Sequence, residues 1–128
     1  MEGEAVSKKQ LTPDLDDRGL IEYFRDKKPK GLDDKTLENL SCLGLARLIV
    51  GEFGGPRKAR IYWLEDGPGD DDSAHAWVVK IGSDPKDKPY NNNLGISKMS
   101  TENATVEQLE REGVDRTEEI LNQPWSTL

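Results

Sequence analysis

The sequence contains one cysteine, Cys42, and one histidine, His75, among its 128 residues. A single cysteine cannot form an internal disulfide and leaves too few thiolate ligands for the usual cysteine-based zinc sites. Because the chain has a single histidine, mechanisms that need two histidines are excluded. No apolar run approaches membrane-spanning length, and no apolar N-terminal stretch resembles a secretion signal. These absences favour a reducing, cytoplasmic location.

Apolar residues are also scarce, since hydrophobic residues make up 34% of the chain and charged residues another 34%. Globular proteins usually contain closer to half apolar residues. Three Trp, three Tyr and two Phe residues nevertheless supply large side chains for a core. The length suits one domain. We therefore expect a flexible N-terminal arm over residues 1–14 and a single α+β domain over residues 15–128.

The charge is distributed unevenly along the chain. Residues 1–64 carry 12 basic and 11 acidic side chains, a net of +1, whereas residues 65–128 carry 6 and 14, a net of −8; together they give −7. Such asymmetry indicates charged partners. An acidic surface repels the phosphates of nucleic acids, so direct nucleic-acid binding is not expected. A solvated surface that only keeps the protein soluble is the simpler alternative.

Two helices are predicted in the first half. The first runs from Asp16 or Asp17, whose carboxylate can cap a helix, to about Lys28. The second starts at Asp33 or Asp34 and ends before the glycine at position 51. Its apolar residues extend almost around the cylinder, which is typical of a helix in the middle of a fold.

After a turn rich in glycine, the apolar period changes from that of a helix to that of a strand. Residues 59–65 and 74–82 alternate as the two strands of a hairpin, joined by a polar loop over residues 66–73. A short third strand is predicted over residues 94–99. We expect residues 83–93, rich in Asp, Lys, Pro and Asn, to form a loop.

The last helix is predicted to open at Thr105, because Thr105–Gln108 matches a capping box. Apolar residues line one side of it and acidic side chains occupy much of the rest, and Pro124 prevents its continuation. Trp125 is expected to fold back as an apolar plug. The fold class is therefore α+β, with two N-terminal helices, a small antiparallel sheet made of the hairpin and a short third strand, and a C-terminal amphipathic helix.

The chemistry-bearing residues predict no catalytic constellation, metal site or cofactor site. The acidic loop fails the spacing of an EF-hand, because the required glycine and closing glutamate are absent. It fits a solvated hairpin tip, weak cation binding or contact with a basic partner. Cys42 lies within a buried helix, where a thiol is inert. The only glycine cluster, residues 51–56, follows a helix and precedes a strand, the reverse of a phosphate-binding loop.

His75 has two interpretations. It is either a structural histidine at the edge of the core or the general base of a small metal-independent enzyme that cleaves phosphodiesters, assisted by Lys80, Arg60 or Tyr62. Lys80 is on the opposite strand face from His75, which weakens the enzyme alternative.

The sequence favours a protein-binding module without enzymatic activity. Small acidic proteins of this kind act as stoichiometric inhibitors or as immunity or antitoxin proteins that cover a basic partner such as a nuclease, in some cases by mimicking nucleic-acid charge. Membrane partners are not expected. The predicted partner-binding residues are Asp66, Asp70, Asp71, Asp72, Glu107, Glu110, Asp115 and Glu118, with Tyr90 and Trp125 as aromatic anchors.

Overall fold

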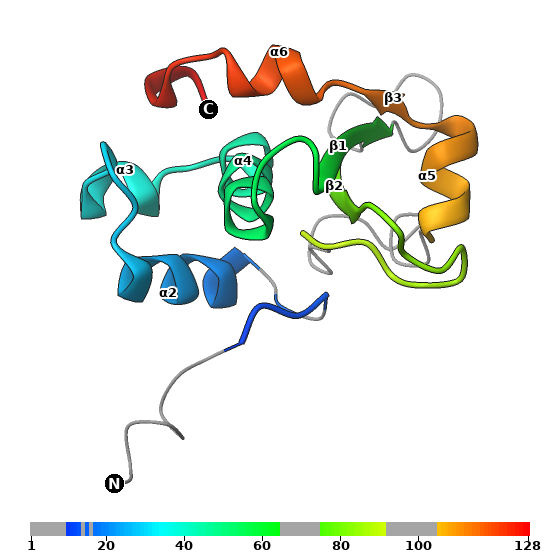
Figure 1. Ribbon diagram of the computed structural model, residues 1–128. Helices are drawn as coiled ribbons and strands as arrows, with labels where there is room; N and C mark the ends of the chain where they lie inside the picture. Colours follow the sequence, from blue (N-terminus) through cyan, green and yellow to red (C-terminus); the bar gives the residue numbers. More distant parts are fainter. Residues whose placement is uncertain (1–9, 14, 16, 65–74, 92–104) are drawn as a thin grey trace, which may run out of the picture.

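The computed structural model describes residues 10–13, 15, 17–64, 75–91 and 105–128 (Figure 1). Its helices and strands confirm the α+β class. In chain order they are α2 (Asp17–Lys27), α3 (Asp34–Glu38), α4 (Cys42–Phe53), β1 (Ala59–Leu64), β2 (His75–Lys80), α5 (Val106–Glu112), β3 (Val114–Asp115), α6 (Thr117–Leu121) and the 3-10 helix η3 (Trp125–Thr127).

The first predicted helix is confirmed as α2, but the second is two helices, α3 and α4. Ser41 interrupts it because its hydroxyl caps α4 by accepting a hydrogen bond from the Leu43 amide at 3.2 Å. The Ser41 amide itself donates to the carbonyl of Leu128 at 2.8 Å. The expected end was also wrong, since α4 continues to Phe53 and Gly54 closes it with a φ of 112°.

The predicted hairpin is confirmed. Strands β1 and β2 pair antiparallel from Ala59 opposite Lys80 to Leu64 opposite His75. The described third strand is β3, which pairs with the other edge of β1. The strand expected over residues 94–99 and the loop over residues 66–73 lie outside the described residues.

Both faces of this sheet are covered, as Figure 1 shows, by α4 on one side and α5 on the other. The larger core joins the helices α2 and α4 to the side chains of Ile61 and Val78. The smaller core lies beneath α5 and contains Trp77, Val79, Val106 and Leu109. The residues that alternate along β1 and β2 are therefore buried on both faces of the sheet.

The segment expected as a single last helix is divided into α5, β3 and α6. Thr105 caps α5 as predicted, with its hydroxyl 3.2 Å from the Gln108 amide. The chain leaves the helix at Gly113, where a β-carbon would lie 2.7 Å from the Leu109 carbonyl oxygen and 3.2 Å from the β-carbon of Tyr62. Only a glycine permits this close approach, and it allows the next two residues to join the sheet as β3.

The segment before α2 is described in part. Leu11 and Leu15 are partly buried and pack against the larger core. Residues 1–9 of the predicted arm lie outside the described part of the chain. At the other end, Trp125 packs against the same core, as expected, and Leu128 is buried.

Candidate protein-binding surface

The exposed acidic side chains of α5 form the first part of the candidate surface. Glu107 and Glu110 are three positions apart on the helix, which places them on one side, whereas Val106 and Leu109 are buried beneath it. Within the described residues, no basic side chain forms an ion pair with Glu107 or Glu110. Both carboxylates are exposed, and the charge of Glu107, after the hydrogen bond and charge of Glu112, adds to the raised pKa of Arg111.

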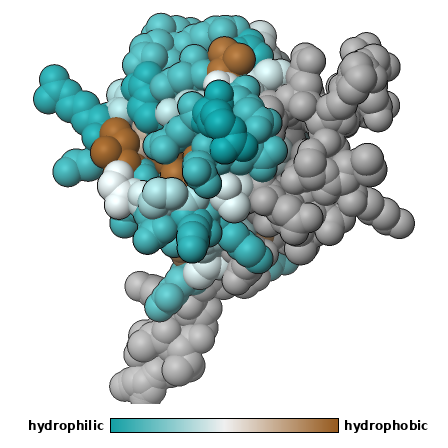
Figure 2. All heavy atoms as spheres, turned by 90° about the vertical axis from the view of Figure 1, so that its right-hand side faces the viewer, coloured by the Kyte–Doolittle hydropathy of each residue, from teal (hydrophilic) through white to brown (hydrophobic). Residues whose placement is uncertain are grey.

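The surroundings of α5 are polar. Figure 2 views the molecule from the side on which α5 lies, and the described residues there are mostly hydrophilic with a few small hydrophobic patches. One exposed apolar residue in this part of the fold is Val114 of β3, whose surface is 60% exposed. It directly precedes Asp115.

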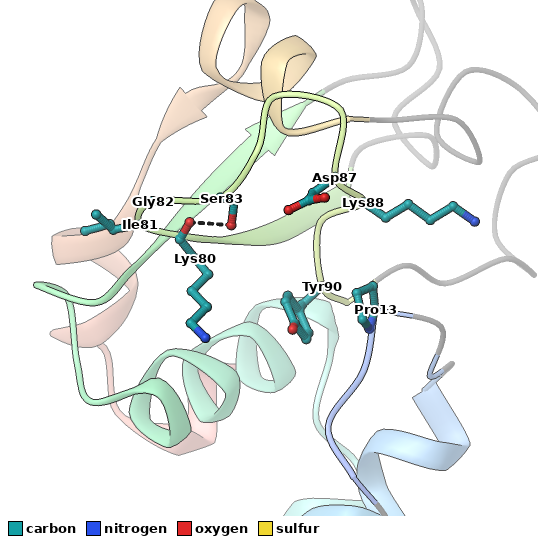
Figure 3. Close-up of a pocket in the computed structure, with 8 residues that line it drawn as sticks. All are labelled: Pro13, Lys80, Ile81, Gly82, Ser83, Asp87, Lys88 and Tyr90. Atoms are coloured by element: carbon teal, nitrogen blue, oxygen red, sulfur yellow. Dashed lines mark hydrogen bonds between the residues drawn. The ribbon is translucent and has the colours of Figure 1, made fainter.

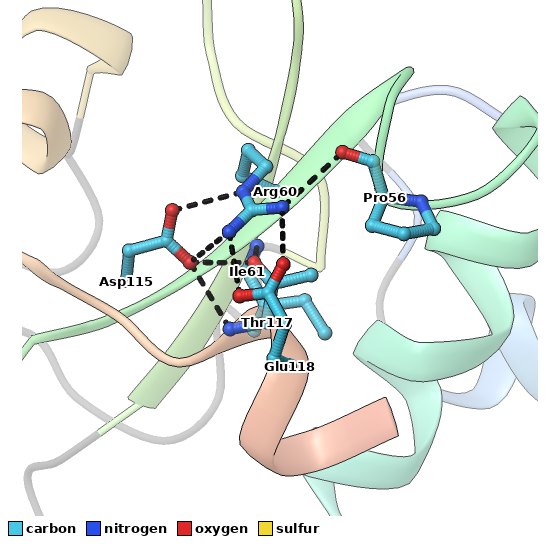
Figure 4. A network of polar contacts seen from close by, with 6 residues as sticks. All are labelled: Pro56, Arg60, Ile61, Asp115, Thr117 and Glu118. Atoms are coloured by element: carbon cyan, nitrogen blue, oxygen red, sulfur yellow. Dashed lines mark hydrogen bonds and ion pairs between the residues drawn. The ribbon is translucent and has the colours of Figure 1, made fainter. Parts of the chain in front are cut away.

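Asp115 and Glu118 form a clasp with Arg60 of β1 (Figure 4). Arg60 Nε is 2.9 Å from Asp115 Oδ2, and its Nη2 is 2.8 Å from Glu118 Oε1. A further bond joins Arg60 Nη1 to Glu118 Oε2 at 2.9 Å. Planar, bidentate contacts of this kind are typical of a guanidinium with a carboxylate. We call these three residues the Arg60 clasp.

The Arg60 clasp shifts the pKa values of its members. Partial burial acts to raise the pKa of Asp115, but hydrogen bonds from Arg60 and Thr117 outweigh it and hold this pKa below its usual range. Hydrogen bonding by Arg60 also lowers the pKa of Glu118. Both carboxylates are therefore ionised at neutral pH, and their charge is partly compensated within the fold.

The predicted acidic residues thus fall into different environments. Glu107 and Glu110 form no ion pair within the described residues, whereas Asp115 and Glu118 belong to the Arg60 clasp. Two further acidic residues are also paired, Glu112 with Arg111 and Glu119 with Arg116. The predicted loop residues Asp66, Asp70, Asp71 and Asp72 lie outside the described part of the chain.

The two predicted aromatic anchors are held by contacts within the fold. Tyr90 packs edge to face against Phe53 with ring centroids 4.8 Å apart, and its backbone exchanges two hydrogen bonds with Val78 of β2. The guanidinium of Arg47 lies 4.1 Å above the centre of the Trp125 ring. Both aromatic residues are half-buried, so part of each surface remains accessible.

The strand register separates the residues of the enzyme alternative. His75 begins β2 and Lys80 ends it, a spacing of about 16 Å along a strand. Arg60 lies opposite Val79, near the Lys80 end, and is occupied by the Arg60 clasp. Tyr62 lies opposite Trp77 and is the nearest of the three to His75 in register. Burial first, and then the charges of Asp115 and Glu110, raise the pKa of Tyr62.

Cys42 is the first residue of α4 and is half-buried rather than fully enclosed. Its carbonyl accepts a hydrogen bond from the side chain of Asn91 at 2.9 Å. In the described part of the chain, no group of three or more His, Cys, Asp or Glu side chains is arranged to hold a metal ion.

Sequence reasoning missed the roles of Arg60 and Val114. The signal for Val114 was present, because a glycine followed by a β-branched residue disfavours a continuous helix at Gly113. Arg60 carried no such signal, since its partners are 55 and 58 positions away.

No protein-family model, curated protein or solved structure matches this chain. None of the helices in the described ranges has the length and apolar character needed to cross a membrane.

Proposed function

We propose that this chain is a small, non-enzymatic protein-binding module that covers a basic partner stoichiometrically, as an inhibitor or an immunity or antitoxin protein does. The observation that carries the proposal is the pair of exposed carboxylates on α5, Glu107 and Glu110, which form no ion pair with any described residue. They lie in the second half of the chain, residues 65–128, which carries a net charge of −8. A basic enzyme such as a nuclease is the partner class that this charge fits best.

The proposed mechanism is electrostatic steering followed by short-range contact. A concentrated field of one sign raises association rates by about 10- to 1000-fold, and this effect weakens as salt increases. Val114, exposed beside the Arg60 clasp, is the apolar contact that we add to the predicted anchors Tyr90 and Trp125. Asp66 and Asp70–Asp72, which lie outside the described residues, stay predicted partner contacts. A single cysteine suits a cytoplasmic setting.

The test begins with capture of the partner from the lysate of the source organism at low salt. The association rate of the captured protein is then measured for the wild type and for a Glu107→Lys/Glu110→Lys variant. Because steering depends on local charge, we expect the variant to associate at least about tenfold more slowly at low salt, with a smaller difference at high salt. A parallel variant that reverses Asp70, Asp71 and Asp72 tests the loop.

The matched control reverses the same amount of charge elsewhere. Asp26 and Asp34 are exposed on α2 and α3, so an Asp26→Lys/Asp34→Lys variant should bind almost as fast as the wild type. Equal rates for the control and for the α5 variant would remove α5 from the interface. Failure to retain any basic protein in a stoichiometric complex would contradict the proposed function itself.

A further inference from the structure

A cavity of about 440 Å³ lies at the end of β2, between the loop over residues 81–90 and Pro13 (Figure 3). Its volume is within the range of about 300–1000 Å³ that is usual for small-ligand sites. Glu107 and Glu110 do not line it, but its loop is joined to the start of α5, where the amides of Val106 and Glu107 each donate at 3.0 Å to the carbonyls of Asp87 and Pro85, respectively. Tyr90, one of the predicted aromatic anchors, also lines this cavity.

The charged residues that line the cavity are Lys80, Lys88 and Asp87. Figure 3 shows the side chain of Lys80 extending toward the same edge of the cavity as the ring of Tyr90, whereas the carboxylate of Asp87 lies toward Ser83. Lys88, although it lines the cavity, extends away from it in this view. Within the described residues, Lys80 has no ion-pair partner, and its ammonium lies 5.4 Å from the ring centre of Phe53.

The polar groups divide into donors and acceptors. Lys80 and the Tyr90 hydroxyl can donate hydrogen bonds, which suits a carboxylate. The Ser83 hydroxyl already donates to the Lys80 carbonyl at 2.6 Å, so its oxygen remains free to accept. Ser83 and the Asp87 carboxylate are therefore suited to an ammonium group.

These groups are held in place before any ligand binds. The Asp87 carboxylate accepts a hydrogen bond from the Asp84 amide at 3.1 Å, and the Asp87 amide donates to the Asp84 carbonyl at 2.9 Å. Tyr90 is fixed by its backbone bonds to Val78 and its contact with Phe53. Gly82 supplies the left-handed turn, with a φ of 90°, that carries the chain from β2 around the cavity.

We propose that this cavity binds a small zwitterion with one ammonium and one carboxylate group, the chemistry of a free α-amino acid or a short peptide. The carboxylate lies against Lys80 and Tyr90, and the ammonium lies against Asp87 and Ser83. A simple anion would meet the Asp87 carboxylate, and a simple cation would meet Lys80, so neither satisfies both groups. Pro13 gives the wall an apolar part, which suits a ligand with an aliphatic side chain, whereas the side chain of Ile81 extends away from Lys80 and Tyr90 in Figure 3.

The ionisation of Tyr90 agrees with its donor role. Burial, and next the negative charge of Asp87, raise the pKa of the Tyr90 hydroxyl. It therefore keeps its proton at neutral pH and can donate to a carboxylate.

The test is a titration of the purified, isotope-labelled full chain, followed through the amide resonances of residues 81–90. The probes are L-leucine, N-acetyl-L-leucine, L-leucinamide and L-leucyl-L-leucine. N-acetylation removes the ammonium and amidation removes the carboxylate, so each is expected to weaken binding at least about tenfold. Tighter binding of the dipeptide than of leucine would identify a peptide as the source of the zwitterion, and the reverse would identify a free amino acid.

Two variants assign the groups. Asp87→Asn keeps an oxygen that can accept from the Asp84 amide, and Lys80→Met keeps a chain of similar length; each should weaken leucine binding at least about tenfold. Asp26→Asn and Lys86→Met, which change exposed residues outside the cavity wall, serve as matched controls and should bind as the wild type does. Should Asp87→Asn or Lys80→Met lose the native spectrum, Tyr90→Phe replaces it, because it removes only a hydroxyl.

Equal binding of leucine and either blocked compound, or no shift with any of the four probes at their solubility limits, would overturn the zwitterion site. Binding to both variants with unchanged affinity would do the same. This titration needs no protein partner, so its failure leaves the proposed function of the α5 surface intact.

Discussion

Thr117 shows how one hydroxyl completes the edge of the sheet. β3 ends at Asp115, yet the amide of Ile61 in β1 still needs an acceptor, and the Thr117 hydroxyl provides one at 2.8 Å. The same hydroxyl donates to Asp115 Oδ1 at 2.6 Å. Thr117 is fully buried, so water cannot replace either bond. This residue therefore links the sheet, the Arg60 clasp and the first turn of α6.

We expect Thr117→Val to lower the free energy of unfolding by about 1–3 kcal/mol, because the shape is retained while the buried Ile61 amide loses its acceptor. Urea denaturation followed by circular dichroism measures this change. Thr117→Ser is the control, since it keeps the hydroxyl and removes only a methyl group, at a cost of about 0.8 kcal/mol. A valine variant as stable as the wild type would show that the hydroxyl bond contributes nothing.

At the scale of helices and strands, hydrophobic spacing predicted where helices and strands occur better than it predicted the residues at which they begin and end. The hairpin and α2 could be located because their apolar periods are distinct and are bounded by turn residues. The break at Ser41 depends on a bond to Leu128, and the break at Gly113 depends on contact with Tyr62. Ser41 and Gly113 are themselves local signals for a break, but the contacts with Leu128 and Tyr62 join distant residues and leave no mark in a local pattern.

The Arg60 clasp joins three elements and should make their stability depend on pH. The pKa values of Asp115 and Glu118 are lowered in the folded state, so their stabilising contribution is present at neutral pH and is lost as pH falls through about 4 and below. We expect Arg60→Met to be less stable than the wild type at pH 7 and this difference to shrink as pH falls below about 4. Urea denaturation at several pH values measures the difference. A difference that stays constant with pH would contradict this account.

For the molecule as a whole, the sequence indicated where charge accumulates but not how the fold compensates it. The excess of acidic residues in the second half was evident from composition, and exposed Glu107 and Glu110 lie where a helix was expected. The pairing of Asp115 and Glu118 with Arg60 depends on β3, which was predicted as helix. The cavity at Lys80 and Asp87 likewise depends on a turn that brings a loop back against β2. Surfaces made by one element were therefore predictable, and sites made by several elements were not.

The two cores differ in size, and this difference predicts which part of the molecule unfolds locally first. The larger core holds α2, α4 and one face of the sheet, whereas α5 is held on the other face by a cluster of four buried residues that includes its own Val106 and Leu109. Fewer buried apolar contacts give a lower free energy of local opening. We expect the amides of residues 109–112 in α5 to exchange with solvent deuterium faster than those of residues 46–50 in α4, with a smaller dependence on denaturant.

Native-state hydrogen exchange at increasing denaturant measures both segments in one experiment. A low opening free energy for α5 would leave its acidic side free to adjust to a partner without unfolding of the larger core. Equal protection of α5 and α4, with the same denaturant dependence, would instead show that the two cores open as one cooperative unit. In that case the sheet transmits the stability of the larger core to α5, and the α5 surface meets its partner as a rigid body.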